Sequence, residues 1–185
     1  MGMGLDGVAA GGWIPSAEDE SEQSELIEDI WEQLRSVDTL LLGRVTFKMW
    51  EKYWPAQATR PSASSFQKEF SRYVDDVKKV VFSRTLKRVS WQNSFLVTGN
   101  ILVAVSRMKS EPGKKMAVVG GPGIANTFVG LDLIDEYRIY IHPLIIGKGK
   151  PILGGVRQSK GLRLISAKVF RSGGIGLHLR RIEGS

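Results

Sequence analysis

The spacing of apolar residues between Ser24 and Val37 predicts an amphipathic helix. Apolar side chains recur there at helical spacing, and carboxylates and glutamines occupy the opposite face. A continuous apolar run follows at 39–42, which is typical of a strand buried on both faces, and Gly43-Arg44 ends it. The apolar positions of the helix are Leu26, Ile27, Ile30, Trp31, Leu34 and Val37.

The alternation of strand and helix continues through the middle of the chain. Short apolar runs indicate buried strands, and Asn100 is a residue type that caps helices. Three such strand and helix units predict a mainly parallel sheet of the α/β class. The predicted elements are a helix at 47–54, a loop at 55–65, strands at 79–82 and 116–119, and a helix at 100–108.

The chain becomes rich in strands after Asp135. A strand is predicted at 137–142, and two alternating segments at 163–169 and 175–181 are joined through Gly173-Gly174. This pattern predicts an antiparallel hairpin at the edge of the sheet. His178 is expected to face outward on an edge strand.

Length and composition favour a single domain over residues 1–185. A chain of 185 residues with 42% hydrophobic content buries one substantial core. Because it has no cysteine and only two histidines, a disulfide framework and a metal centre are not expected. No apolar run approaches the length of a membrane span, and no secretory leader is evident. We expect a cytoplasmic protein without a membrane partner.

The net charge of +7 is compatible with a nucleic-acid surface or with a pocket for a polyanionic small molecule. The basic residues occur in ones and twos without interleaved aromatic residues, and the densest charge block, at 18–28, is acidic. This distribution favours a phosphate-bearing ligand and no nucleic-acid partner.

The segment Gly-Gly-Pro-Gly-Ile after the strand at 116–119 is the first candidate for phosphate binding. Glycines between a buried strand and a helix let a phosphate approach backbone amides at the positive end of the helix dipole. The alternative is a tight turn that requires glycine only for its backbone conformation. The candidate ligands are Gly120, Gly121, Pro122, Gly123 and Ile124.

Two further strand ends carry phosphate-compatible side chains. Gly43, Arg44 and Thr46 follow one predicted strand, and Ser83 and Arg84 follow another. A guanidinium group suits bidentate contact with phosphate, and hydroxyl groups add donors. For Arg44 an ordinary surface position is the alternative. Three such strand ends fit a ligand with several phosphates along the carboxyl edge of a parallel sheet.

Several motifs together resemble the reductase domain of riboflavin biosynthesis, in the dihydrofolate-reductase-like superfamily. They occur in the same order as in that family and span nearly the whole chain. The motifs are Leu5-Asp6-Gly7 with Trp13 shortly after, Leu41-Leu42-Gly43-Arg44-x-Thr46, Val81-x-Ser83, Val119-Gly120-Gly121-x-Gly123, and Leu133-Ile134-Asp135-Glu136 followed by Pro143 and Gly147-x-Gly149.

The resemblance implies a dihydrofolate-reductase-like three-layer fold, with a mostly parallel central sheet, an antiparallel C-terminal hairpin and flanking helices. It implies NADPH as cofactor, with Gly43, Arg44 and Thr46 at its phosphates and Ser83 and Arg84 at the adenosine ribose and 2′-phosphate. The glycine segment would hold the pyrophosphate, with a cis peptide between Gly120 and Gly121. Relatives often dimerise, so a homodimer is expected, with Val169, Phe170, Ile175 and Leu177 as its apolar patch.

Asp6 is the candidate catalytic residue, because the resemblance places it beside the nicotinamide. It would contact the substrate or relay a proton; the alternative is a turn-forming aspartate before Gly7. Trp13 and Trp50 are candidate substrate contacts, although a tryptophan at helical spacing such as Trp50 often belongs to the core. His142 is expected to be structural.

The expected function is that of an NADPH-dependent reductase that transfers a hydride to a small planar heterocyclic acceptor, pterin-like or pyrimidine-like. The alternatives are a non-catalytic or regulatory NADPH-binding module and dihydrofolate reductase proper. The sequence departs from the family in two respects. Only four residues precede Leu5, so the strand expected there is missing or shortened, and the Cys-x-x-Cys of a zinc deaminase domain is absent.

Overall fold

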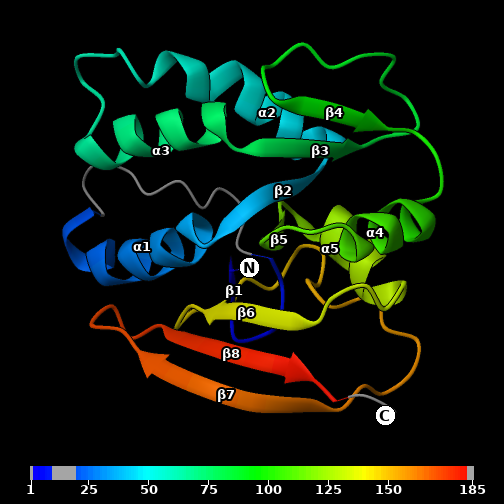
Figure 1. The fold of residues 1–185 in the computed structure, drawn as a ribbon. Helices are drawn as coiled ribbons and strands as arrows, with labels where there is room; N and C mark the ends of the chain where they lie inside the picture. Colours follow the sequence, from blue (N-terminus) through cyan, green and yellow to red (C-terminus); the bar gives the residue numbers. More distant parts are fainter. Residues whose placement is uncertain (1, 10–19, 183–185) are drawn as a thin grey trace. The chain divides into compact units, whose positions relative to one another are not determined.

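The computed structural model describes residues 2–9 and 20–182 (Figure 1). The chain groups into two compact units. Unit 1 comprises Met1–Glu32 and Gly121–Ser185, and unit 2 comprises Gln33–Gly120.

Unit 2 is built on a four-stranded parallel sheet with the order β4-β3-β2-β5. Figure 1 shows the arrowheads of β2, β3 and β4 pointing the same way. The predicted parallel sheet is therefore confirmed, although β4 was not expected from the sequence. The strands are β2 (Val37–Gly43), β3 (Lys78–Phe82), β4 (Ser94–Val97) and β5 (Lys115–Val119).

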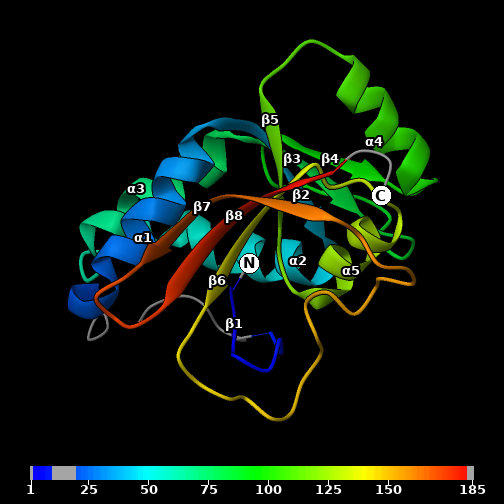
Figure 2. The same ribbon diagram turned by 90° about the horizontal axis from the view of Figure 1, so that it is seen from below.

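Helices cover both faces of this sheet. In the order of the sheet, the step from β2 to β3 runs toward β4, whereas the step from β4 to β5 runs back toward the opposite edge. Because both crossovers are right-handed, α2 and α3 lie on one face of the sheet and α4 lies on the other. Figure 2 shows this separation of α2 from α4. The helices are α2 (Arg44–Tyr53), the 3-10 turn η1 (Trp54–Ala56), α3 (Ser65–Asp76) and α4 (Ile101–Ser110).

Helix α3 was missed in the sequence, although its start carries a recognisable signal. The Ser64 hydroxyl accepts the amide of Gln67, and the Gln67 side chain accepts the amide of Ser64, which forms a capping box. The predicted cap at Asn100 is confirmed, since its side chain accepts the Val103 amide at 3.3 Å. Both helices thus begin with a side chain that satisfies a backbone donor.

Unit 1 contains a second sheet, with the order β1-β6-β8-β7. β1 pairs with β6 in parallel, and β6, β8 and β7 pair antiparallel, so the predicted C-terminal hairpin is confirmed. It was expected at the edge of the parallel sheet but belongs to this second sheet, in which β7 is the edge strand. The strand expected before Leu5 is shortened to the two residues of β1. The elements are β1 (Gly2–Met3), β6 (Glu136–Ile141), β7 (Leu162–Val169), β8 (Ile175–Arg181), α1 (Glu20–Arg35) and α5 (Pro122–Gly130).

The two faces of this sheet bury different clusters, because side chains alternate along β6. Tyr137 and Ile139 pack with Val129 of α5. Tyr140 points the other way and packs with Leu26 of α1 and with Phe170. Helices α1 and α5 therefore lie on opposite faces of the unit 1 sheet.

Three details of the sequence prediction were wrong. Helix α1 ends at Arg35, and Val37 begins β2 instead of closing the helix. β8 is an inner strand, so His178 does not face solvent: its side chain is 11% exposed and its Nε2 lies 3.1 Å from Glu136 Oε2. Phe170 is buried and unavailable to a dimer patch.

No helix in the described ranges is long and apolar enough to span a membrane.

Candidate functional site

Three adjacent strand ends of unit 2 carry the predicted phosphate-binding residues. β2 lies between β3 and β5, with Gly43 paired to Phe82 and Leu42 paired to Val119. Because all three strands are parallel, their carboxyl ends meet at one edge of the sheet. The segments that follow them begin at Arg44, Ser83 and Gly120 and therefore leave from neighbouring positions.

Helix α2 begins directly at the end of β2. Gly43 is its N-cap residue, with extended backbone angles and no side-chain cap hydrogen bond. Arg44 is exposed, whereas Thr46 is only 9% exposed. The start of α2 therefore offers first-turn amides that no side chain caps, with an exposed guanidinium group beside them, which suits an anion.

The connection after β3 begins with a turn organised by Ser83. Its Oγ accepts the amides of Thr85 at 3.2 Å and Leu86 at 3.0 Å and lies 3.4 Å from the Thr85 hydroxyl, so the Ser83 side chain shapes the turn. Arg84 is exposed, and so are Lys87 and Arg88.

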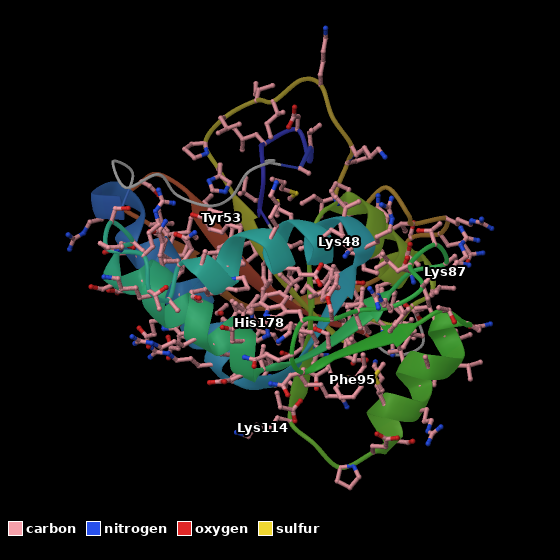
Figure 3. The ribbon with its side chains drawn as sticks, turned by 90° about the horizontal axis from the view of Figure 1, so that it is seen from above. Lys48, Tyr53, Lys87, Phe95, Lys114 and His178 are labelled. Atoms are coloured by element: carbon pink, nitrogen blue, oxygen red, sulfur yellow. The ribbon has the colours of Figure 1, made fainter. Side chains whose placement is uncertain are left out.

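Lys87 and Arg88 were missed in the sequence. Their signal was the basic run that continues past the strand end at Ser83-Arg84. Figure 3 shows Lys87 toward the carboxyl-terminal edge of the parallel sheet, whereas Lys114, just before β5, lies at the opposite edge.

Gly120 and Gly121 separate β5 from helix α5, which begins at Pro122 with Gly121 as its N-cap residue and no side-chain cap hydrogen bond. A Cβ atom built at Gly121 or Gly123 would meet nothing within 4 Å. Gly120 has a φ angle of 143°, which favours glycine. The positive φ angle thus accounts for a glycine at position 120. At Gly121 and Gly123, by contrast, the fold leaves open space where a side chain would stand.

The predicted cis peptide between Gly120 and Gly121 is wrong. Every peptide bond in the described part of the chain is trans. The turn is made instead by the positive φ angle of Gly120, which reverses the chain without the cost of a cis bond.

Asp6 lies in unit 1 and its carboxylate is held by backbone amides. Oδ2 accepts the amides of Ile146 at 3.1 Å and Gly147 at 2.7 Å, and Oδ1 accepts the amide of Val8 at 3.3 Å. The Gly147 amide is the largest influence that holds the pKa of Asp6 below its usual value. These contacts favour the turn-forming alternative, and the catalytic role remains a prediction.

Replacing Asp6 by Asn separates these two roles. We expect Asp6→Asn to lower the melting temperature at pH 7, because an uncharged amide is a weaker acceptor and turns one NH2 group toward backbone donors. Since the folded pKa lies below the ordinary 3.8, the stabilisation by Asp6 is present above that pH and is lost as the pH falls through the folded pKa. The difference from wild type should therefore shrink in acid.

Thermal melts from pH 2 to 7 check this expectation. An unchanged melting temperature at pH 7 would contradict the anchoring role. If reductase turnover were lost at the same time, that result would favour a proton relay.

Trp13 and Trp50 are the two predicted substrate contacts, and the structure describes only Trp50. Trp13 lies outside the described residues. Trp50 is 8% exposed and packs edge to face on Trp54 and Phe70, with ring centroids 6.3 and 5.6 Å apart. The structure therefore favours the core alternative for Trp50.

Within the described ranges no cluster of three His, Asp or Glu side chains could hold a metal ion.

The chain is similar to proteins of several bacteria. YyaP, an uncharacterized protein of Bacillus subtilis strain 168, is 37% identical over 140 residues, which cover 76% of this chain and 72% of YyaP. In the structure comparison, the Thermotoga maritima diaminohydroxyphosphoribosylaminopyrimidine deaminase/5-amino-6-(5-phosphoribosylamino)uracil reductase matches with a TM-score of 0.64 at 16% identity. That match covers 98% of this chain and 55% of the Thermotoga chain.

Dihydrofolate reductase of Enterococcus faecalis, solved with NADP(H), matches with a TM-score of 0.53 at 10% identity over 84% of this chain and 82% of that one. These structural likenesses establish the dihydrofolate-reductase-like fold. The model of the RibD C-terminal domain matches residues 1–175, which is nearly the full length. With the ordered motifs, the two-sheet α/β fold and this match in agreement, the chain belongs to the RibD C-terminal domain family.

Proposed function

We propose that this protein is an NADPH-dependent reductase that transfers a hydride to a small planar heterocyclic acceptor. The observation that carries the proposal is the carboxyl edge of the unit 2 sheet, where Arg44, Ser83 and Arg84 follow neighbouring strands. The family supports a reductase of the riboflavin-pathway type. The Enterococcus relative, solved with NADP(H), supports the choice of nucleotide.

The starts of two helices support a phosphate ligand. Helices α3 and α4 are capped by Ser64 and Asn100, but α2 and α5 begin at glycines without a side-chain cap. Uncapped amides at the positive end of a helix bind phosphate oxygens well. The contrast fits a role in phosphate binding for each of these helix starts.

Exposed cations favour NADPH over NADH. Arg84, Lys87 and Arg88 are all exposed in the connection after β3. The 2′-phosphate is the group that distinguishes NADPH from NADH, and a guanidinium group can bind it in bidentate fashion. We assign Arg84 to this contact, because it lies nearest the strand end of the three.

The protein's own part in the reaction is to bind and align the reactants. Bound NADPH supplies the hydride at its nicotinamide ring. The protein residues hold the phosphates and thereby fix the position of the ring, since alignment accounts for much of the acceleration in such reactions.

An exposed apolar pair on α2 is suited to the acceptor. Val45 is 71% exposed and Met49 is 51% exposed, one helical turn apart and next to Arg44. Apolar side chains bind the face of a planar ring, and methionine adapts to its shape. The name of the Thermotoga protein refers to pyrimidine and uracil substrates, and we propose a related ring, pyrimidine-like or pterin-like, as the acceptor here.

Titration of the purified protein with NADPH and NADH tests the cofactor. We expect Arg84→Ala to weaken NADPH by about tenfold to a hundredfold, the loss of one or two charge-assisted hydrogen bonds, and to leave NADH almost unchanged. Arg107→Ala is the matched control, because Arg107 is an exposed arginine near the end of α4, paired with Glu111 at 3.4 Å. It should change neither affinity.

Three outcomes would count against parts of the proposal. A folded sample that binds neither nucleotide would refute the nucleotide site. Equal weakening of both nucleotides by Arg84→Ala would refute the 2′-phosphate assignment. Tight NADPH binding without oxidation on a panel of pterins, pyrimidines and dihydrofolate would instead support the non-catalytic module, which the amide-bound carboxylate of Asp6 favours.

A further inference from the structure

Lys79 on β3 is fully buried, although lysine usually keeps its ammonium group in water. Its Nζ donates hydrogen bonds to the carbonyl oxygens of Val74, Asp75 (3.2 Å) and Val77 (2.9 Å). These carbonyls lie in the last turn of α3 and just after it, where they lack partners within the helix. Since a buried ammonium group requires such partners, Lys79 and the end of α3 satisfy each other.

The same ammonium group lies 4.6 Å from the ring centroid of Trp91. Trp91 belongs to the connection between β3 and β4, is 8% exposed, and donates its Nε1 hydrogen to Asp75 Oδ1 at 2.6 Å. Burial lowers the pKa of Lys79 to about 8, while the Asp75 and Asp76 carboxylates act in the opposite direction. The amine thus remains mostly protonated at pH 7, and a cation–π interaction joins β3 to the connection.

Further contacts fix the residues on either side of Trp91. Ser90 Oγ donates to Glu51 of α2 at 3.2 Å. Asn93 Nδ2 donates to the carbonyls of Asp75 and Asp76 at 3.0 and 3.1 Å, and the Lys79 amide donates to the Asn93 carbonyl at 2.8 Å. The segment 90–93, which we call the anchor segment, is therefore tied to α2, α3 and β3.

The connection that ends in the anchor segment is the one that carries the candidate 2′-phosphate contacts. It leaves β3 at Ser83, presents Arg84, Lys87 and Arg88, and runs back beside α2 to the start of β4 (Figure 1). The Ser83 turn holds its first end. Its far end is held by the contacts of Lys79 and Trp91.

We propose that Lys79 and Trp91 are positioning residues that set the place of the cations at 84–88 and thereby the preference for a nucleotide with a 2′-phosphate. This inference rests on the proposed function. A buried hydrophobic residue at position 79 would fill the core without the desolvation cost of a charge. A hydrophobic residue could not take this role, because the ammonium group of the lysine binds both the carbonyl oxygens at the end of α3 and the ring of Trp91.

The test compares Lys79→Met with Lys78→Met. Lys78 is the preceding residue on β3 and is exposed, with its amine 5.6 Å from the Phe95 ring, so the control removes the same charge from the same strand without touching the anchor segment. Hydrogen exchange of the peptide 84–93 measures the anchoring. Titration with NADPH and NADH measures the preference.

In Lys79→Met we expect exchange over 84–93 to rise by about tenfold, because both the cation–π contact with Trp91 and the hydrogen bonds to the carbonyls at the end of α3 are lost. The dissociation constant for NADPH should rise by about tenfold and that for NADH by less than about threefold. Trp91→Leu should behave alike, and Trp91→Phe, which keeps an aromatic face, should restore most of the preference. Lys78→Met should match wild type in every measurement.

Unchanged exchange in both Lys79→Met and Trp91→Leu would overturn the anchoring. Raised exchange with an unchanged ratio of NADPH to NADH affinity would overturn the positioning role. If the wild-type protein bound neither nucleotide, the proposed function would be refuted, and so would the link between the anchor segment and the preference for NADPH. The hydrogen-exchange measurement would still decide whether Lys79 and Trp91 hold the anchor segment. If Lys79→Met does not fold, Trp91→Leu and Trp91→Phe give the same decisions.

Discussion

Gly155→Ala is expected to lower the free energy of unfolding by about 3 kcal/mol or more, at the upper end of overpacking effects. A Cβ atom at Gly155 would lie 2.2 Å from the carbonyl oxygen of Asn126 and 3.0 Å from its Cα. These are backbone atoms of α5, so no side-chain rotation can relieve the clash. Urea unfolding of the variant beside wild type measures the loss.

The close approach exists because the segment after β6 is fastened to α5. Asn126 Nδ2 donates to the carbonyl of Pro151 at 3.0 Å, and a Cβ at Gly130 would come within 3.0 Å of the Gly155 carbonyl. Gly99→Ala is the control, because a Cβ there meets nothing within 4 Å. A Gly155→Ala variant as stable as Gly99→Ala would show that this packing is not present in solution.

Gly121→Ala is expected to weaken NADPH binding by about a hundredfold while leaving stability within about 0.5 kcal/mol of wild type. The backbone of Gly121 is extended, with φ −78°, and a Cβ would meet nothing within 4 Å, so the fold tolerates alanine. A phosphate bound at the first amides of α5 would meet the added methyl group. The two effects are therefore separable.

Fluorescence titration with NADPH and a thermal melt on the same sample check this expectation. The control is Gly113→Ala at the other end of β5, where only the tip of Asp38 must shift, since the Cβ would lie 3.3 Å from Oδ2. It should leave the affinity unchanged. A Gly121→Ala protein with wild-type affinity would mean that the glycine serves the turn alone.

The local pattern of the sequence was sufficient for most of the elements but not for all. Continuous apolar runs predicted β2 and β3, because a strand buried on both faces leaves that signature by itself. The run at 116–119 also predicted β5, although that strand lies at the edge of the sheet and its apolar residues are only partly buried. Helix α3 was hidden behind a stretch rich in proline, serine and alanine, although Ser64 and Gln67 carried its capping signal. β4 was missed because its four residues are partly exposed and show no period.

For the candidate site, the sequence identified the segments, and the tertiary structure decided what their side chains do. The glycines and arginines after β2, β3 and β5 were recognisable because a strand end and a helix start are local features. That these three ends are neighbours follows from the strand order. Strand order depends on pairing between residues far apart in the chain, which no local pattern encodes.

By itself, therefore, the sequence determined the α/β class, the parallel strands, the C-terminal hairpin and the phosphate-compatible strand ends, because periodicity, caps and glycines act over a few residues. Only the tertiary structure decided the roles of Asp6, His178 and Lys79. Two of the amides bound by Asp6, those of Ile146 and Gly147, lie 140 and 141 residues farther along the chain. His178 contacts Glu136 from the neighbouring strand of the sheet. Lys79 is indistinguishable in sequence from Lys78, yet only Lys79 is buried, since burial depends on which elements pack around a position.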